Sequence, residues 1–85
     1  MKMMINFATK KSTLRAFESE MKNYKAYVCG FDTEPATKLR MFHQAMGVML
    51  AYENIYPCYT EQIHNIGMLY NEQLQIVVDF YANEP

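Results

Sequence analysis

The chain has 85 residues, of which 51% are hydrophobic and 20% are charged, and its formal net charge at pH 7 is −1. This length predicts one domain with one core, and three isolated glycines exclude the glycine-rich loops that bind phosphates. The longest apolar stretch, residues 45–52, is far shorter than the roughly 20 residues that span a bilayer, so we expect no membrane association.

The N-terminus lacks the features of a secretory leader, which predicts a cytoplasmic protein with reduced cysteines.

Charge is distributed unevenly along this chain. All eight lysine and arginine residues lie before residue 41 together with four acidic residues, whereas residues 41–85 hold five acidic residues and no lysine or arginine. The two parts therefore carry charges of +4 and −5. Such asymmetry indicates an electrostatic partner.

The first predicted elements are an extended arm and a helix. Residues 1–8 alternate between apolar and polar types, which fits a short strand or an arm that pairs or swaps with a neighbour. Residues 12–29 then form a predicted helix, in which Glu18 and Lys22 make a favourable i, i+4 pair and Gly30 supplies a left-handed C-cap. The apolar stripe at steps of 3 and 4 consists of Leu14, Phe17, Met21, Tyr24 and Val28.

A second helix is predicted over residues 34–54. Asp32 or Thr33 can cap its N-terminus, and Pro35 is tolerated in the first turn because its missing N–H would be unpaired there in any case. Apolar residues cover most of its circumference, which predicts a central, buried helix. Gly47 and Ala51 lie four residues apart in the remaining narrow strip, where their small size would let another helix approach closely.

Pro57 ends this helix, and a third helix is predicted from Thr60 onward. Residues 66–81 also fit a strand or a hairpin, which would make the fold α+β. We favour the helix, because residues 71–73 lack a turn dipeptide and the helical stripe is unbroken. The expected fold is thus an all-α, single three-helix domain of residues 1–85 with a short extended N-terminal arm. The stripe of the third helix consists of Ile63, Ile66, Tyr70, Leu74, Val77 and Tyr81.

Two cysteines and two histidines are the right inventory for a zinc site, but their order is Cys29, His43, Cys58 and His64. Structural zinc sites pair their ligands at short spacing, and these residues are widely spaced. We therefore expect no metal and no cofactor. Cys58 lies just before a helix N-terminus, which can activate a thiol, yet no oxyanion-binding loop accompanies the Cys58–His64 pair. A small Cys/His enzyme is only the third hypothesis.

The stronger signal is a basic face on the first predicted helix. Lys11, Arg15, Lys22 and Lys25 fall within an arc of about 80° at 100° per residue. This face could contact the phosphates of a nucleic acid or an acidic protein surface, including that of another copy of this chain.

Tyrosine and methionine are abundant, and both residue types are enriched in protein interfaces. Tyr56 and Tyr59 flank the corner before the third helix and are candidate contact residues. The sequence favours a non-catalytic protein–protein interaction module of the inhibitor or adaptor type. Its partner would be another protein or a second copy in a homo-oligomer. The alternative is a small nucleic-acid-binding accessory protein that uses the basic face.

Overall fold

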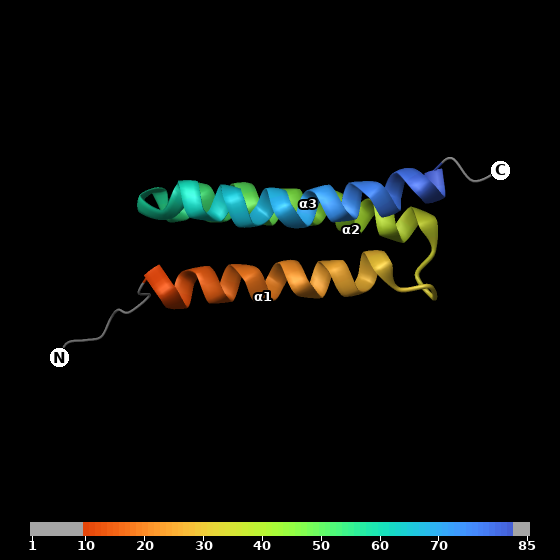
Figure 1. Ribbon diagram of the computed structural model, residues 1–85, viewed down its shortest axis with the longest axis horizontal. Helices are drawn as coiled ribbons and strands as arrows, with labels where there is room; N and C mark the ends of the chain where they lie inside the picture. The colour runs from red at the N-terminus through yellow and green to blue at the C-terminus, as the bar shows by residue number, and fades with distance from the viewer. Residues whose placement is uncertain (1–9, 83–85) are drawn as a thin grey trace.

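The fold is a bundle of three helices in a computed structural model, which describes residues 10–82 (Figure 1). The helices are α1 (Lys10–Cys29), α2 (Pro35–Ile55) and α3 (Thr60–Ala82), and a short 3-10 turn, η2 (Pro57–Tyr59), joins the last two. Helices α1 and α3 run in the same direction, α2 runs in the opposite one, and each contacts the other two (Figure 1). The all-α prediction is confirmed, whereas the predicted arm of residues 1–8 lies outside the described residues.

The alternative with a strand or hairpin at residues 66–81 is wrong, because α3 is continuous over that range. A strand would place Leu74, Ile76 and Val78 on one face. In the structure Leu74 is fully buried while Ile76 is 70% exposed. Burial therefore follows the helical period and not the alternating one.

The core is formed by residues spaced three or four apart on each helix. Each helix lies against both neighbours, so α2 is not the central helix that its composition predicts, and its Leu39 and Leu50 are exposed. No helix of residues 10–82 combines the length and the apolarity needed to cross a membrane. The buried apolar side chains are Phe17, Met21, Val28, Phe42, Ala45, Met49, Ile63, Leu74 and Val78.

The connection from α1 to α2 differs from its prediction. The φ angle of Gly30 is not in the left-handed region, so Gly30 is not a left-handed C-cap. A Cβ atom there would lie 3.0 Å from the carbonyl oxygen of Ala26, so the missing side chain provides space. Pro35 occupies the first turn as predicted. However, the N-cap residue is Glu34 without a side-chain cap, and neither Asp32 nor Thr33 has that role.

Lys38 of α2 caps the C-terminus of α1 from outside that helix. Its side chain is only 1% exposed, and Nζ donates hydrogen bonds to the carbonyl oxygens of Val28 (2.7 Å) and Gly30 (2.6 Å). Nζ also lies 4.7 Å from the ring centroid of Tyr81 in α3. The last turn of α1 contains no basic residue. Lys38 therefore supplies the positive charge that the carboxyl end of a helix favours, and it ties all three helices together.

Gly67 of α3 faces the other two helices at short distance. A Cβ atom at this position would lie 2.7 Å from Cγ of Met49 in α2 and 3.3 Å from Cζ of Phe17 in α1. By contrast, a Cβ atom at Gly47 would meet nothing within 4 Å. The glycine that permits close packing within the bundle is thus Gly67 and not Gly47.

The two glycines allow a matched test of this packing. We expect Gly67→Ala to lower the free energy of unfolding by up to about 2 kcal/mol, because overpacking against Met49 and Phe17 costs about 1–3 kcal/mol and the better helix propensity of alanine returns about 1 kcal/mol. Gly47→Ala should instead raise it by about 0.5–1 kcal/mol, because only helix propensity changes. Urea unfolding followed by circular dichroism measures both. Stabilisation of equal size in the two variants would contradict the packing at Gly67.

Candidate functional site

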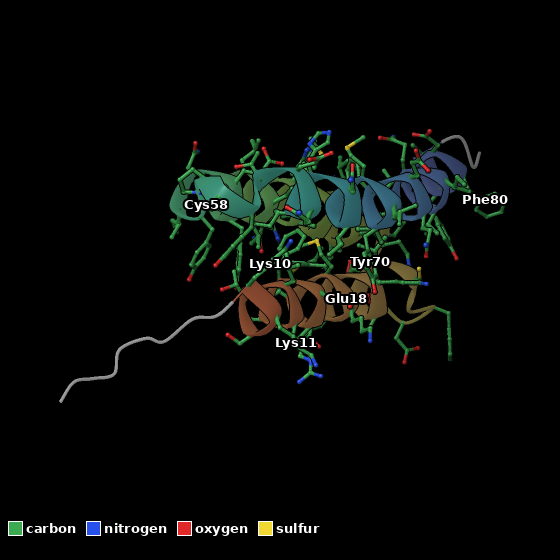
Figure 2. All side chains as sticks on the ribbon, turned by 60° about the vertical axis from the view of Figure 1, so that its left-hand side comes forward. Lys10, Lys11, Glu18, Cys58, Tyr70 and Phe80 are labelled. Carbon is green, nitrogen blue, oxygen red and sulfur yellow. The ribbon has the colours of Figure 1, made fainter. Side chains whose placement is uncertain are left out.

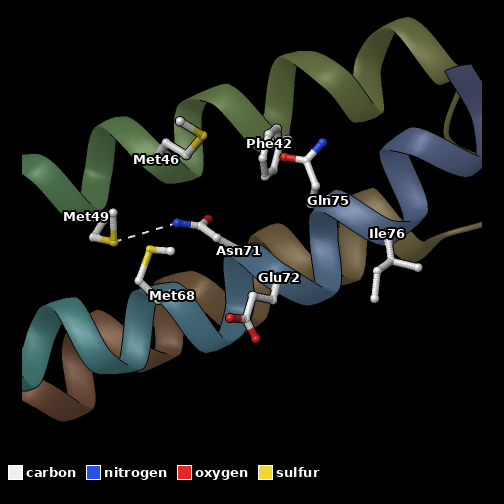
Figure 3. A pocket seen from close by; sticks show the side chains of 8 residues that line it. All are labelled: Phe42, Met46, Met49, Met68, Asn71, Glu72, Gln75 and Ile76. Atoms are coloured by element: carbon white, nitrogen blue, oxygen red, sulfur yellow. Dashed lines mark hydrogen bonds between the residues drawn. The ribbon is translucent and has the colours of Figure 1, made fainter.

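An apolar groove runs between α2 and α3 and has a volume of about 590 Å³ (Figure 3). Its α2 wall is formed by residues spaced four and three apart, so they share one helix face, and α3 supplies the opposite wall. No residue of α1 lines it. The apolar lining residues are Phe42, Met46, Met49, Met68 and Ile76.

The lining is adaptable because three of these residues are methionines. Methionine is unbranched and polarisable, and it fits partners of varied shape. Beyond the groove, the apolar surface of α3 continues with the exposed side chains of Leu69 and Phe80, and Figure 2 shows Phe80 projecting from the bundle. A connected apolar surface of this kind is typical of an interaction site.

Asn71 is a polar residue at the floor of this groove. Its side chain points from α3 toward α2 (Figure 3) and is 7% exposed. Its Nδ2 atom donates to Sδ of Met49 at 3.6 Å, while its buried Oδ1 atom accepts no hydrogen bond. A buried acceptor without a protein donor costs about 1–3 kcal/mol, so Asn71 is a polar group in the groove that a water molecule or a ligand can satisfy.

The side of the bundle that holds the groove is acidic. Glu72 lines the groove, and the other charged residues of α3 are Glu61 and Asp79. Helix α2 has two basic residues, both near its start. Lys38 is buried, and Arg40 is exposed. A ligand that enters the groove therefore meets negative charge at its edge.

The structure places the predicted basic residues on the outer side of α1. Lys11, Arg15 and Lys22 are exposed, and Lys25 is half-buried. Figure 2 shows Lys11 pointing away from the bundle. The expected ion pair between Glu18 and Lys22 does not form, whereas His64 and Glu53 lie within ion-pair distance of each other.

Both acidic residues of α1 are bound by tyrosines of the neighbouring helices. The hydroxyl of Tyr52 in α2 donates to Oε2 of Glu20 at 2.5 Å, and that of Tyr70 in α3 donates to Oε2 of Glu18 at 3.3 Å. Glu18 and Tyr70 lie between α1 and α3 in Figure 2. Burial, followed by the nearby Glu20 carboxylate, raises the pKa of Tyr52 to about 12. Burial and Glu18 also raise the pKa of Tyr70.

Tyr56 and Tyr59 lie at the corner between α2 and α3 and are half-buried. Their ring centroids are 6.3 Å apart in a stacked arrangement, and Tyr56 also lies 5.7 Å from Tyr52. They pack against the core and do not line the α2/α3 groove. The hydroxyl of Thr60, the first residue of α3, donates to the carbonyl oxygen of Glu53 at 3.1 Å and closes this corner.

The cysteines and histidines are not gathered into one site. Cys29 and Cys58 are exposed free thiols. His64 has Glu53 as its neighbour, with Nδ1 lying 3.2 Å from Oε2. Within residues 10–82, no three side chains among histidine, cysteine, aspartate and glutamate are placed to hold a metal ion.

Sequence reasoning missed the groove and Asn71. The sequence predicted that the methionines are core or interface residues. It did not predict which of them lie opposite each other across two helices. A signal was present, because an asparagine at position 71 interrupts the buried series Ile63, Gly67, Leu74 and Val78. Comparisons of the chain with family models, with curated proteins and with solved structures find no significant match.

The Tyr52 hydroxyl gives a pH-dependent prediction. The folded chain holds this group neutral up to about pH 12, whereas the unfolded chain ionises it near pH 10. The stability contributed by this raised pKa is fully present below pH 10 and is lost as pH rises toward 12. The difference in unfolding free energy between the wild type and Tyr52→Phe should therefore be constant below pH 10 and shrink above it.

Unfolding measurements across this pH range test the prediction, and an ultraviolet absorbance titration follows the tyrosine directly. Glu20→Gln is the control, because it keeps the size of the side chain and removes the carboxylate that holds the hydroxyl proton. Tyrosine ionisation should then begin at lower pH. A difference in unfolding free energy that stays constant through pH 12 would contradict the assignment.

Proposed function

We propose that the protein is a non-catalytic interaction module of the inhibitor or adaptor type. Its α2/α3 groove binds an apolar peptide segment that is flanked by lysine or arginine. The observation that carries this proposal is the apolar, methionine-lined groove beside the acidic residues of α3. The apolar lining supplies affinity, and the charge selects the partner and speeds its association.

Charge also bears on whether the occupant is a second copy. The exposed apolar surface of α3 belongs to a helix whose charged residues are all acidic, so two copies of α3 would repel each other. Helix α1 has the matching charge, but it exposes small or polar residues such as Ala16, Ser19 and Asn23, and Tyr27 is its one large exposed apolar side chain. A single apolar side chain would leave most of the apolar groove uncovered. A separate basic and apolar segment fits the groove better than either surface of a second folded copy.

A synthetic peptide tests the proposed chemistry. The probe alternates leucine with serine and carries two lysines at each end, and a matched peptide carries glutamates in place of the lysines. Titration into protein with carbon-13 methionine methyl groups should shift the signals of Met46, Met49 and Met68, which line the groove. The signal of Met21, buried in the core, should remain unchanged.

A charge reversal serves as the control for specificity. Glu72→Lys should weaken binding of the lysine peptide about threefold to tenfold and strengthen binding of the glutamate peptide, because one partly exposed charge pair is worth about 0.2–1 kcal/mol and its reversal adds repulsion. Equal affinity for both peptides, or shifts confined to methionines outside the groove, would contradict the proposal.

Binding of nucleic acid by α1 is a second candidate function, and one observation favours it. Because Tyr70 and Tyr52 bind Glu18 and Glu20, the acidic side chains of α1 are engaged by neighbouring helices. Both carboxylates keep their charge, because the hydroxyl groups are neutral, but they are directed toward α2 and α3, whereas Lys11, Arg15 and Lys22 are exposed. Such a face binds phosphates with an affinity that falls steeply with salt.

Fluorescence anisotropy with a short labelled duplex tests this candidate. We expect binding at about 50 mM salt and a linear fall of log K with log salt concentration. The variant Lys11→Glu/Arg15→Glu should bind more weakly and reduce the slope by about two, one for each cation removed. Glu61→Gln on α3 is the control and should leave the slope unchanged. Absence of binding at the low salt concentration rejects this function.

A further inference from the structure

We infer that the α2/α3 groove binds its peptide in an extended conformation, and that Asn71 and Gln75 accept hydrogen bonds from two backbone N–H groups of that peptide. The inference rests on the proposed function, because it names the conformation of the ligand in the same groove. Asn71 then determines specificity, since it selects extended segments over helical ones. The apolar lining alone makes no such selection, because hydrophobic contact is non-directional.

Asn71 offers a buried acceptor to a ligand in the groove. Its side chain lines the groove, is only 7% exposed, and points from α3 toward α2 in Figure 3. Its Nδ2 atom donates to Sδ of Met49, which sets the orientation of the amide. The Oδ1 atom has no donor among residues 10–82. A water molecule can satisfy this atom in the free chain, and a peptide N–H that displaces the water forms a direct hydrogen bond in its place.

Gln75 provides a second amide one turn farther along the same face of α3. It also lines the groove, and its Nε2 atom donates to Oδ1 of Asp79 at 2.7 Å. Figure 3 shows its side-chain oxygen directed toward Phe42 of α2, which lines the groove as well. Because Asp79 holds the Nε2 atom, Gln75 presents an acceptor to the groove, as Asn71 does.

The spacing of the two amides matches the repeat of an extended chain. Asn71 and Gln75 are four residues apart, which corresponds to a rise of about 6 Å along a helix. Two residues of an extended chain span about 6.6 Å, and the N–H groups of alternate residues point to the same side. An extended peptide that lies along α3 therefore presents one N–H group to each amide.

A helical ligand would not satisfy these acceptors, because its backbone N–H groups are bonded within the helix except in the first turn. In an extended ligand, by contrast, successive side chains point to opposite faces. One alternate set of side chains then contacts Met46, Met49 and Met68 of the groove, and the other set faces solvent. The expected ligand is thus a segment in which apolar and polar residues alternate.

Replacement of single backbone amides by esters tests these hydrogen bonds. An ester lacks the N–H group and adds no bulk, and it can be placed at each central position of the leucine–serine peptide with lysines at its ends. In one alternate set of positions, either the leucines or the serines, an ester should weaken binding about threefold to tenfold, because it leaves an acceptor of the groove unpaired. Esters in the other set should leave the affinity unchanged, because those N–H groups face away from α3. Equal effects in both sets would overturn the inference.

Variants of α3 assign each effect to a side chain. Asn71→Leu keeps the number and branching of the side-chain heavy atoms but lacks the acceptor, so the largest ester effect should disappear. Gln75→Leu should remove the effect of an ester two residues away in the peptide. Gln73→Leu is the matched control, because Gln73 is an exposed amide of α3 that does not line the groove, and it should keep the wild-type pattern. Ester effects that persist in Asn71→Leu and Gln75→Leu, with helix content unchanged by circular dichroism, would contradict the assignment.

A helical form of the peptide separates this inference from the proposed function. It has the same composition, with its leucines three and four residues apart so that they share one helix face. It should bind about tenfold more weakly than the alternating peptide, because it leaves the acceptors of Asn71 and Gln75 unpaired. Equal or tighter binding of the helical form overturns the inference and leaves the proposed function standing. Absence of binding by both peptides contradicts the proposed function, and the inference with it.

Discussion

The absence of a side chain at Gly67 leaves the space that Met49 of α2 and Phe17 of α1 occupy against α3, and Met49 also lines the groove. Met49 fills the space that a side chain at position 67 would take, and its sulfur accepts the hydrogen bond from Asn71. Met49 therefore belongs to the core and also lines the groove. Because core side chains pack at crystal-like density, a change at this layer would alter stability and the shape of the groove together.

Hydrogen bonds between the helices determine how charge is presented to a partner. Lys38 is a basic residue by sequence, but its amine is bound by two backbone carbonyl groups and is unavailable at the surface. Glu18 and Glu20 are engaged by tyrosines in a similar way. The tyrosine hydroxyl groups are neutral, so both carboxylates keep their charge. The opposite charges of α1 and α3 therefore follow from the order of residues along the chain, and packing determines which of the charged groups are exposed.

The periodic features of the fold were predictable from the sequence, because the 3.6-residue period and Pro35 and Pro57 act locally. The observed helices, Lys10–Cys29, Pro35–Ile55 and Thr60–Ala82, begin and end close to their predicted limits. The roles of Gly30, Gly67 and Lys38 were not predictable, because each depends on atoms that other parts of the chain bring close. The groove was hidden for the same reason. Its walls come from two helices, and Met49 and Asn71 are 22 residues apart in the sequence.

Asn71 shows how stability and binding compete in a bundle of this size. An apolar residue at this position would remove the cost of a buried acceptor, about 1–3 kcal/mol, which is a large share of the stability of a small domain. It would also remove the buried polar side chain that lines the groove. In the binding that we propose, a donor of the ligand would hydrogen-bond to Oδ1 of Asn71 and offset this cost. Hydrophobic contact with the methionines alone would not distinguish an extended peptide from a helix.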